Sequence, residues 1–489
     1  MMKKKLLAMT LSMLMGTALL GGCATTTVSE DGGGTASGAA EGTEATDGNS
    51  SDAMKGNGDK TLNVFLYMQE HEKEIYKGLV EEFVEEHKDE IKEVVFEITT
   101  QDEYNTKMIA NMTASDMPDV FYCAPADVRK YVDNGYIQPL DDYVDQATVD
   151  KLWGTTQTIY RYDGTNIGEG SLYALPKDFS CFAFAYNKTL FDEAGLDYPD
   201  PEKPYTYDEF IEVCKALTVD KDGDGEIDQW GVANANQFGM TPYLYSNGVK
   251  FLNEDMTKVN VANNEALKNA LTFYTDLTLN GLTPSVDQDA ALGGYQRWLD
   301  GQIGFYACGT WDVAAFMDEN TFPYEWDLCG WPVGPDGDGR SHTWMGSVAY
   351  CISKDTENPD LCAELVAKLS TDEAGQKAVS GITTGHSIQL PNLRDLAYGE
   401  FLDAVNNGEL PFPSNVRVLF GYFEGDDAYE ATLQETDYTY NAEWFTPFHT
   451  GVANIQRGNI TVEDFLAEVE PEMQSLLDNA IELQGSAKN

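Results

Sequence analysis

The chain has 489 residues, and 31 Lys and Arg against 82 Asp and Glu give a formal net charge of −51. Hydrophobic residues make up 42% and aromatic residues 11%, which is too much apolar surface for a disordered acidic protein. The charge repels polyanions and so argues against nucleic acid as a partner and against electrostatic docking on anionic lipid. Since a domain usually has about 100–200 residues, the length predicts a folded protein of two or more domains.

Residues 1–22 have the pattern of a secretory signal peptide. Lysines at positions 3–5 precede an almost wholly apolar run over residues 6–20, which is too short for a comfortable membrane span. The run ends in Leu-Gly-Gly followed by Cys23, which resembles a bacterial lipobox. The resemblance implies that Cys23 is lipidated and begins the mature chain; an ordinary cleavage site is the alternative. We therefore expect a protein on the extracellular face of a bacterial cell membrane, held there only by its lipid anchor.

Residues 24–59 are rich in Gly, Ser, Thr, Asp and Glu, so we expect a flexible tether that joins no core. No later segment has about 18 consecutive apolar residues, so no other membrane span is predicted.

Seven cysteines follow Cys23, an odd number, and none of them forms a Cys-x-x-Cys pair. They are therefore predicted to be small buried hydrophobic residues, not a disulfide framework or a zinc site.

The folded part begins with strands and helices in alternation. Residues 61–67, 94–98 and 119–122 read as strands, and residues 72–90 and 102–112 as helices, the first with a solvated acidic face. This alternation predicts an α/β fold with a parallel sheet. Ligands of such sheets bind beyond the carboxyl ends of the strands. The candidate binding residues at those ends are Tyr67, Gln69, Glu70 and Asp127.

An acidic loop at residues 220–228 has the spacing of an EF-hand calcium loop. Four aspartates take positions 1, 3, 5 and 9, and a glycine takes position 6, where the chain must turn sharply. At position 12, Gly231 replaces the usual bidentate Glu. We predict a structural Ca²⁺ site, with a solvated acidic turn as the alternative. Its expected ligands are Asp220, Asp222, Asp224, Glu226 and Asp228.

Near the end of the chain, Thr461 and Asp464 resemble a capping box that opens an amphipathic helix. Pro471 is predicted to end or kink that helix.

Several sequence blocks resemble the extracellular solute-binding proteins of bacterial ABC importers, the family that includes the maltose-binding protein. The blocks are Met-Pro-Asp-Val-Phe at 117–121, Asp-Asn-Gly-Tyr-Ile-Gln-Pro-Leu at 133–140, Tyr-Ala-Leu-Pro at 173–176, Tyr-Asn-Lys-Thr-Leu-Phe-Asp-Glu-Ala-Gly-Leu at 186–196, Thr-Tyr-Asp-Glu-Phe at 206–210, Gly-Gln-Ile-Gly-Phe-Tyr at 301–306, Gly-Thr-Trp at 309–311 and Gly-Asn-Ile-Thr-Val-Glu at 458–463. Each block is weak alone, but their order and spacing behind a lipobox identify the chain as a member of this family.

The resemblance implies a two-lobe, periplasmic-binding-protein-like α/β fold with a hinge between discontinuous lobes. Residues 60–177 and 346–390 would form the first lobe, and residues 178–345 and 391–489 the second. The chain would cross between the lobes near residues 176–184 and return near residues 344–347.

The resemblance also implies a ligand site between the lobes. Trp311 lies where this family often places a tryptophan that stacks on sugar, and Asp312 could accept hydrogen bonds from sugar hydroxyls. Further candidates by position are Trp344, Asn236, Phe238, Asp178 and Phe179. Trp230, beside the acidic loop, is expected in the core.

The implied function is to capture a carbohydrate, specifically an oligosaccharide, and to deliver it to the permease subunits of an ABC importer. The expected protein is a monomer without enzymatic activity. A binding protein for a peptide or another polar solute is the first alternative. A secreted glycan hydrolase is the second, although the sequence has no metal-binding histidine pair, no Gly-x-Ser-x-Gly turn and no phosphate-binding loop.

Overall fold

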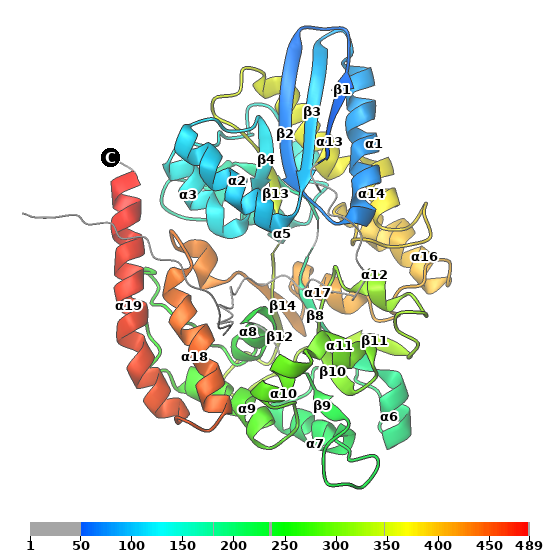
Figure 1. Ribbon diagram of the computed structural model, residues 1–489, viewed down its shortest axis with the longest axis vertical. Helices are drawn as coiled ribbons and strands as arrows, with labels where there is room; N and C mark the ends of the chain where they lie inside the picture. The colour runs from blue at the N-terminus through cyan, green and yellow to red at the C-terminus, as the bar shows by residue number, and fades with distance from the viewer. Residues whose placement is uncertain (1–49, 179, 234–236, 347, 488–489) are drawn as a thin grey trace, which may run out of the picture. The chain divides into compact units, whose positions relative to one another are not determined.

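The computed structural model describes residues 50–178, 180–233, 237–346 and 348–487 (Figure 1). A six-stranded sheet contains the segments that the sequence predicts as the first strands. The strands β2, β3 and β4 pair in parallel, whereas β1, β13 and β7 join antiparallel, so the sheet is mixed. In spatial order the strands are β1 (Ser50–Lys55), β3 (Ile91–Thr99), β2 (Lys60–Tyr67), β4 (Val120–Cys123), β13 (Ala349–Ile352) and β7 (Ala174–Pro176).

The strand β1 corrects the expected extent of the tether, which we placed as far as residue 59. Residues 50–55 pair with β3 over their whole length, from Ser50 opposite Ile98 to Lys55 opposite Glu93. The composition of residues 50–55 gives no strand signal, because these residues contain no hydrophobic run. Backbone hydrogen bonds to the open edge of β3 hold them in place instead. Asp52 adds an ion pair of 2.8 Å to Lys77 on helix α1 (Glu70–Glu86).

Helices pack against this sheet, and the two predicted between residues 72 and 112 are confirmed within a few residues. Helices α1, α13 and α14 contact one another, and Figure 1 shows α1 and α13 beside the strands β1 to β3. The remaining bounds in this region are α2 (Gln101–Ala114), η1 (Pro125–Asp127), α3 (Val128–Asp133), α4 (Gln146–Val149), α5 (Gly154–Thr158), β5 (Arg161–Tyr162), β6 (Ser171–Leu172), α13 (Pro359–Thr371), α14 (Glu373–Val379) and α15 (Arg394–Leu396).

A second, four-stranded sheet has the order β11-β8-β10-β9. A separate two-stranded sheet joins β12 to β14 in parallel. The strands are β8 (Phe182–Asn187), β9 (Trp230–Val232), β10 (Ile303–Gly309), β11 (Trp326–Cys329), β12 (Ser341–Trp344) and β14 (Tyr429–Thr432). The helices are α6 (Lys188–Ala194), α7 (Tyr207–Leu217), α8 (Gln237–Tyr245), α9 (Glu265–Leu279), α10 (Val286–Ala291), α11 (Gly294–Leu299), α12 (Val313–Phe316), η2 (Ala397–Phe401), α16 (Leu402–Asn406), α17 (Arg417–Glu424), η3 (Glu435–Tyr438), η4 (Glu443–Phe445), α18 (Thr446–Gln456) and α19 (Val462–Ala487).

Two hydrophobic cores define two lobes that are discontinuous in sequence. One core is built from residues between 54 and 175 and between 349 and 396. The other takes residues between 181 and 345 and between 390 and 477, together with Trp153. Trp230 belongs to the second core, with 5% of its surface exposed, as expected.

Two chain segments cross between the lobes side by side. Lys177 N donates to Val348 O at 2.9 Å, and Gly346 N donates to Ser180 O at 3.2 Å. A further bridge joins Cys181 to Met345. At these contacts, which we call the crossing ladder, the outgoing and returning segments run antiparallel next to the antiparallel pair β7–β13.

Helix α19 shows that one of the two predicted effects of Pro471, an end of the helix, is wrong. The helix runs through Pro471 without ending, and Figure 1 shows it as one long curved helix. Proline removes one backbone hydrogen bond. Apolar side chains on both sides of it stay buried, among them Phe465, Leu466 and Met473, and this packing holds the helix together.

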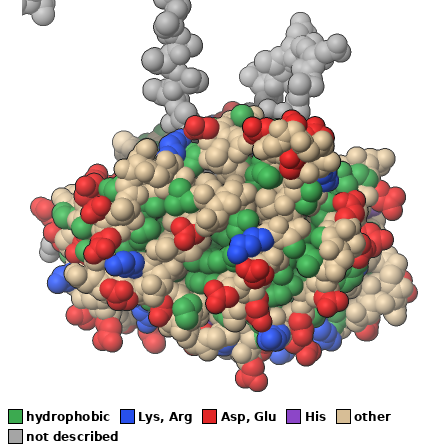
Figure 2. Space-filling view, turned by 90° about the horizontal axis from the view of Figure 1, so that it is seen from below, with side chains coloured by type: hydrophobic (Ala, Val, Ile, Leu, Met, Phe, Trp, Pro, Cys, Tyr) green, Lys and Arg blue, Asp and Glu red, His purple; other side chains and the backbone are tan. Residues whose placement is uncertain are grey.

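On one face of the molecule the negative charge is dispersed. Figure 2 shows acidic side chains spread over the face that it presents, among hydrophobic and basic ones. In the part of the chain that the structure describes, no helix is both long and apolar enough to cross a membrane. All seven cysteines after Cys23 are free thiols in buried positions, which confirms the prediction; they are Cys123, Cys181, Cys214, Cys308, Cys329, Cys351 and Cys362.

Candidate functional site

Three aromatic side chains form a row beside the crossing ladder. The Phe182 ring lies 5.0 Å from the Trp311 ring, edge to face at 87°, and 5.6 Å from the Trp344 ring. Phe182 begins β8, Trp311 follows the end of β10, and Trp344 ends β12. Trp311 keeps 44% of its surface exposed, and Trp344 is half-buried. An exposed indole held on a rigid edge offers an apolar face to a ligand.

Asp312 lies next to this row but is held by its own turn. Its Oδ2 accepts a hydrogen bond from Gly309 N at 3.1 Å. Burial raises the pKa of Asp312 to about 7, and the Gly309 N–H opposes that rise only in part. The carboxyl group is therefore held at the turn that carries Trp311, and its contact with a sugar hydroxyl remains a prediction.

Asp178 is tied to the same ladder through Ser180. Ser180 Oγ donates to Asp178 Oδ1 at 2.9 Å, while Ser180 O accepts from Gly346 N. Asp178 also lies 3.5 Å from Lys177 Nζ. The structure thus brings Asp178 close along the backbone to the residues that carry Trp344.

Lys177 is the centre of a buried ionic group that the sequence analysis missed. Its Nζ lies 2.7 Å from Glu72 Oε1, and only 8% and 4% of these two side chains are exposed. Gln389 Nε2 donates to the same Glu72 oxygen, and Gln69 N donates to Glu72 Oε2 at 2.8 Å. Burial lowers the pKa of Lys177, but the charges of Glu72 and Asp178 outweigh it and raise the pKa well above its usual value. Glu72 is therefore not part of the solvated acidic helix face that we expected.

Tyr67 lies at the end of β2, half-buried, as the strand-end rule predicts. Its ring packs edge-on against Tyr104 and Tyr122, each 5.1 Å away. Burial raises the pKa of Tyr67 to about 12, and the charges of Lys177 and Asp178 also act on its hydroxyl. Tyr67 therefore lies within electrostatic reach of the ionic group at the first crossing.

The other predicted residues of the first lobe are engaged locally. Gln69 caps helix α1 through its backbone N–H, and its side chain is exposed. Glu70 pairs with Lys73 at 2.6 Å on the same helix. Asp127 pairs with Lys130 at 2.5 Å. These pairs are typical of helix surfaces, and the structure does not bring Gln69 or Glu70 to the aromatic row.

Three predicted residues fall outside the described residues: Cys23, Phe179 and Asn236. The backbone of Phe238 lies in α8, but its side chain is not described.

The acidic loop brings three of its five predicted ligands together. Carboxylate oxygens of Asp220, Asp222 and Asp224 lie within 4.8 Å of one another. Oxygens from three carboxylates suit a hard cation such as Ca²⁺. Glu226 is exposed, and Asp228 Oδ2 accepts instead from Lys221 N at 2.7 Å.

A buried carboxyl group at Asp437 is a further residue that the sequence analysis missed. Asp437 lies in η3, which is in contact with η1 of the other lobe. Its Oδ2 has no hydrogen-bond partner among the described residues. Burial raises the pKa of Asp437 to about 7, and a backbone hydrogen bond at Gln434 only partly opposes this. No motif marks this residue, and the contact of η3 with η1 joins segments that are far apart in the sequence.

Replacing Asp437 by Asn should therefore change the pH dependence of stability. Between about pH 4 and 7 the folded chain holds a proton that the unfolded chain has released, so stability falls as pH rises through this range. Asp437→Asn removes this loss, and we expect a gain of about 1–3 kcal/mol at pH 8 and little change at pH 4. Urea denaturation at both pH values measures it, with the exposed Asp255→Asn as the control. An equal gain at both pH values would contradict the account.

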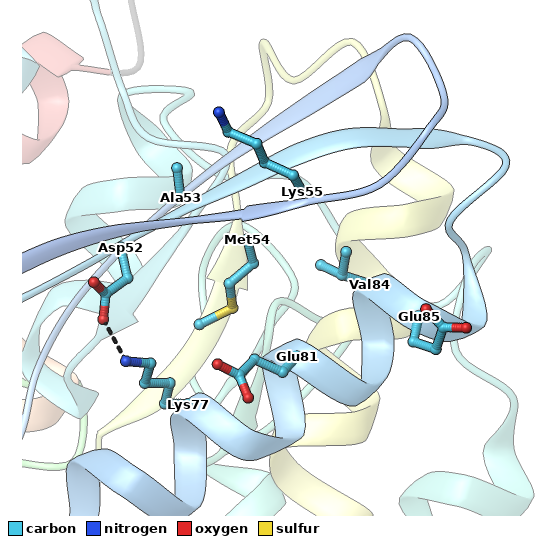
Figure 3. A pocket seen from close by; sticks show the side chains of 8 residues that line it. All are labelled: Asp52, Ala53, Met54, Lys55, Lys77, Glu81, Val84 and Glu85. Atoms are coloured by element: carbon cyan, nitrogen blue, oxygen red, sulfur yellow. Dashed lines mark ion pairs between the residues drawn. The ribbon is translucent and has the colours of Figure 1, made fainter.

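Two surface hollows among the described residues lie apart from the predicted ligand residues. The one in Figure 3 has a volume of about 360 Å³ and is lined by residues 52–55 of β1 and by side chains of α1. Its walls include the Asp52–Lys77 ion pair and two glutamates, Glu81 and Glu85. A second hollow of about 280 Å³ is lined by Gly381, Ile382, Gly385, Glu400, Asp403, Ala404, Asn407, Glu409 and Leu410. Neither contains a residue that the sequence predicted for ligand binding.

Comparisons with known proteins agree with this architecture. The maltotriose-binding protein of Pyrococcus abyssi is 22% identical over 360 residues, which are 73% of this chain and 69% of that protein. The arabinooligosaccharide-binding protein of Halalkalibacterium halodurans is 25% identical over 55% of this chain and 58% of its own length. An ABC substrate-binding protein of Listeria monocytogenes, solved in complex with cycloalternan, has the same fold, with a TM-score of 0.69, 20% identity, and coverage of 86% of this chain and 100% of that chain.

The chain also matches a family model. Residues 69–377 match the model of the family described as bacterial extracellular solute-binding protein. This segment runs from the start of α1 into α14 and so includes both crossing segments and the whole aromatic row. The two-lobe α/β fold and this match give one conclusion: the chain belongs to the family of bacterial extracellular solute-binding proteins.

Proposed function

We propose that this protein captures a carbohydrate, an oligosaccharide, between its two lobes and delivers it to an ABC importer. The observation that carries the proposal is the exposed Trp311, held beside Phe182 and Trp344 at the crossing between the lobes. Sugar rings have apolar C–H faces that lie on such rings, and their hydroxyls need fixed acceptors, which Asp312 and Asp178 supply nearby. The names of the relatives from Pyrococcus abyssi and Halalkalibacterium halodurans support the same ligand class.

The charge of the chain supports a neutral ligand. With a net charge of −51, an anionic solute would meet a repulsive field as it approached. The protein would act as a monomer without enzymatic activity, and ligand binding would favour the closed arrangement of the lobes because both lobes then contact the ligand.

Calorimetric titration against maltotetraose, arabinotetraose and xylotetraose tests the proposal, with product analysis after long incubation. We expect saturable binding of at least one sugar and no cleaved product. Cleaved sugar would instead indicate a hydrolase. Absence of binding to every sugar would overturn the carbohydrate assignment and favour a peptide or another polar solute.

We propose that Cys23 carries a lipid anchor, because a basic and apolar leader ends in Leu-Gly-Gly-Cys. The protein would then lie on the extracellular face of the membrane and meet the importer there. In cells that express Cys23→Ala, the protein should leave the membrane fraction and appear in the soluble fraction. An unchanged distribution would contradict the anchor.

We propose that the loop of Asp220, Asp222 and Asp224 binds Ca²⁺ with a structural role, because its three carboxylates converge and repel one another without a cation. If calcium at 1 mM is about a hundredfold above the dissociation constant, it should stabilise the fold by about 2.7 kcal/mol relative to chelator. Thermal melting measures this as a rise of a few degrees.

The control for calcium is the paired change Asp222→Asn and Asp224→Asn, which should abolish the rise in melting temperature. Asp255→Asn, an exposed acid outside the loop, should keep it. Equal melting of the unaltered protein in calcium and in chelator would rule the site out.

A further inference from the structure

Two glycines lie directly behind the two tryptophan rings of the aromatic row. A Cβ atom built on Gly309 would fall less than 3.0 Å from three ring atoms of Trp311, and these are its nearest neighbours. A Cβ atom on Gly346 would meet three ring atoms of Trp344 in the same way. Real Cβ atoms do not approach other atoms so closely, so each ring occupies space that any other residue would need for its side chain.

Backbone conformation does not explain these two glycines. Gly309 and Gly346 are absent from the glycines with positive φ, so their backbone suits other residues. The reason for glycine is therefore space: each indole lies against the bare Cα of the glycine two positions away.

Both glycines are fixed to the same crossing segment. Gly309 pairs with Phe182 across β8 and β10. Gly346 N donates to Ser180 O at 3.2 Å. On the Gly346 side, Thr343 Oγ1 donates to Phe182 O at 2.5 Å, which fixes the strand that carries Trp344. Residues 180–182 thus lie between the segment that carries Trp311 and the segment that carries Trp344. The Phe182 ring contacts both indoles.

We propose that Gly309 and Gly346 are positioning residues that set the orientation of Trp311 and Trp344 for stacking on a sugar ligand. The inference rests on the proposed function and adds to it the residues that shape the platform. Each glycine lets one side of the indole pack against backbone, so that the other side stays available to the ligand. Replacement by alanine would push the ring out of this position.

We expect the substitution of either glycine by alanine to lower the affinity for sugar more than it lowers the stability of the fold. Trp311 is 44% exposed, so its ring can rotate away from a new methyl group without displacing core residues. Gly309→Ala should therefore weaken sugar binding about tenfold, since the stacking face is lost, while the melting temperature changes little. Gly346→Ala should act likewise on Trp344, with a larger effect on melting because that ring is half-buried.

The experiment combines ligand-free ¹⁹F NMR of 5-fluorotryptophan-labelled protein with calorimetric titration of the three tetrasaccharides. Trp311→Phe and Trp344→Phe identify the two resonances. Gly309→Ala should shift the Trp311 resonance, and Gly346→Ala the Trp344 resonance, before any sugar is added. The control Gly293→Ala lies before α11, where a Cβ meets nothing within 4 Å, and should leave both resonances and the affinity unchanged. The control Gly451→Ala collides with Phe465 in the core and should lower the melting temperature only.

A double-mutant cycle tests the positioning role even if an alanine variant folds poorly. In the Trp311→Ala background the collision is absent, so adding Gly309→Ala should change neither melting nor affinity further. Sugar binding that Gly309→Ala and Gly346→Ala leave unchanged, or unshifted tryptophan resonances, would overturn the positioning role alone. Absence of sugar binding in the unaltered protein would overturn the proposed function and this inference together.

Discussion

Replacing Lys177 by Met should destabilise the protein by about 3–5 kcal/mol, the largest stability effect that we expect from a single change. The substitution leaves the Glu72 carboxylate buried without its counter-ion, and an uncompensated buried charge is far more costly than the pair is stabilising. The effect should reach beyond one contact, because Glu72 also receives hydrogen bonds from Gln389 and from the start of α1. Urea denaturation, followed by tryptophan fluorescence, measures it.

A matched ion pair on the same helix provides the control. Lys73 pairs with Glu70 at 2.6 Å, but 87% of the Glu70 side chain is exposed. Lys73→Met should therefore cost less than about 1 kcal/mol. Adding Glu72→Gln to Lys177→Met should restore part of the lost stability, because the isolated charge is then gone. Equal losses for Lys177→Met and Lys73→Met would contradict the assignment of a buried ionic centre at the crossing.

Replacing Trp311 by Ala should weaken carbohydrate binding by about 10- to 100-fold, equal to about 1.4–2.7 kcal/mol. The exposed indole is the largest apolar surface in the row, and a sugar ring that stacks on it would lose that contact entirely. Trp311→Phe keeps an aromatic face and should lose less. Isothermal titration with the best-binding tetrasaccharide measures both variants.

Tyr198 is the matched control for this prediction. It is another exposed aromatic residue, with 41% of its surface accessible, but it packs against Tyr186 and Phe191 of its own lobe. Tyr198→Ala should leave the affinity unchanged. If Trp311→Ala and Tyr198→Ala bind sugar equally well, Trp311 is not part of the site.

The sequence was sufficient to predict the elements that hydrophobic periodicity marks. The buried strands β2, β3 and β4 and the amphipathic helices α1 and α2 appear within a few residues of their predicted bounds. The strand β1 was missed because residues 50–55 are held by backbone pairing to an edge and carry no apolar pattern. The predicted helix end at Pro471 was wrong, because side-chain packing along α19 outweighs one missing hydrogen bond.

The residues of the candidate site also fall into two groups: those that a local sequence pattern predicts and those that depend on long-range contacts. Trp311 was predictable because a short Gly-Thr-Trp block carries the family resemblance, and Asp220, Asp222 and Asp224 because their spacing is local. Phe182 and the pair of Lys177 with Glu72 were not, because each acquires its role from a partner more than a hundred residues away. Glu72 illustrates the point: in sequence it is one acid among many on a helix, and only the fold places it beside a buried lysine.

A crystal structure with the best-binding tetrasaccharide tests the central claim most directly. We expect one sugar ring stacked on the indole of Trp311, with Trp344 and Phe182 in the same wall and hydroxyls hydrogen-bonded to Asp178 or Asp312. A sugar bound away from this row, with Trp311 still exposed to solvent, would contradict the account.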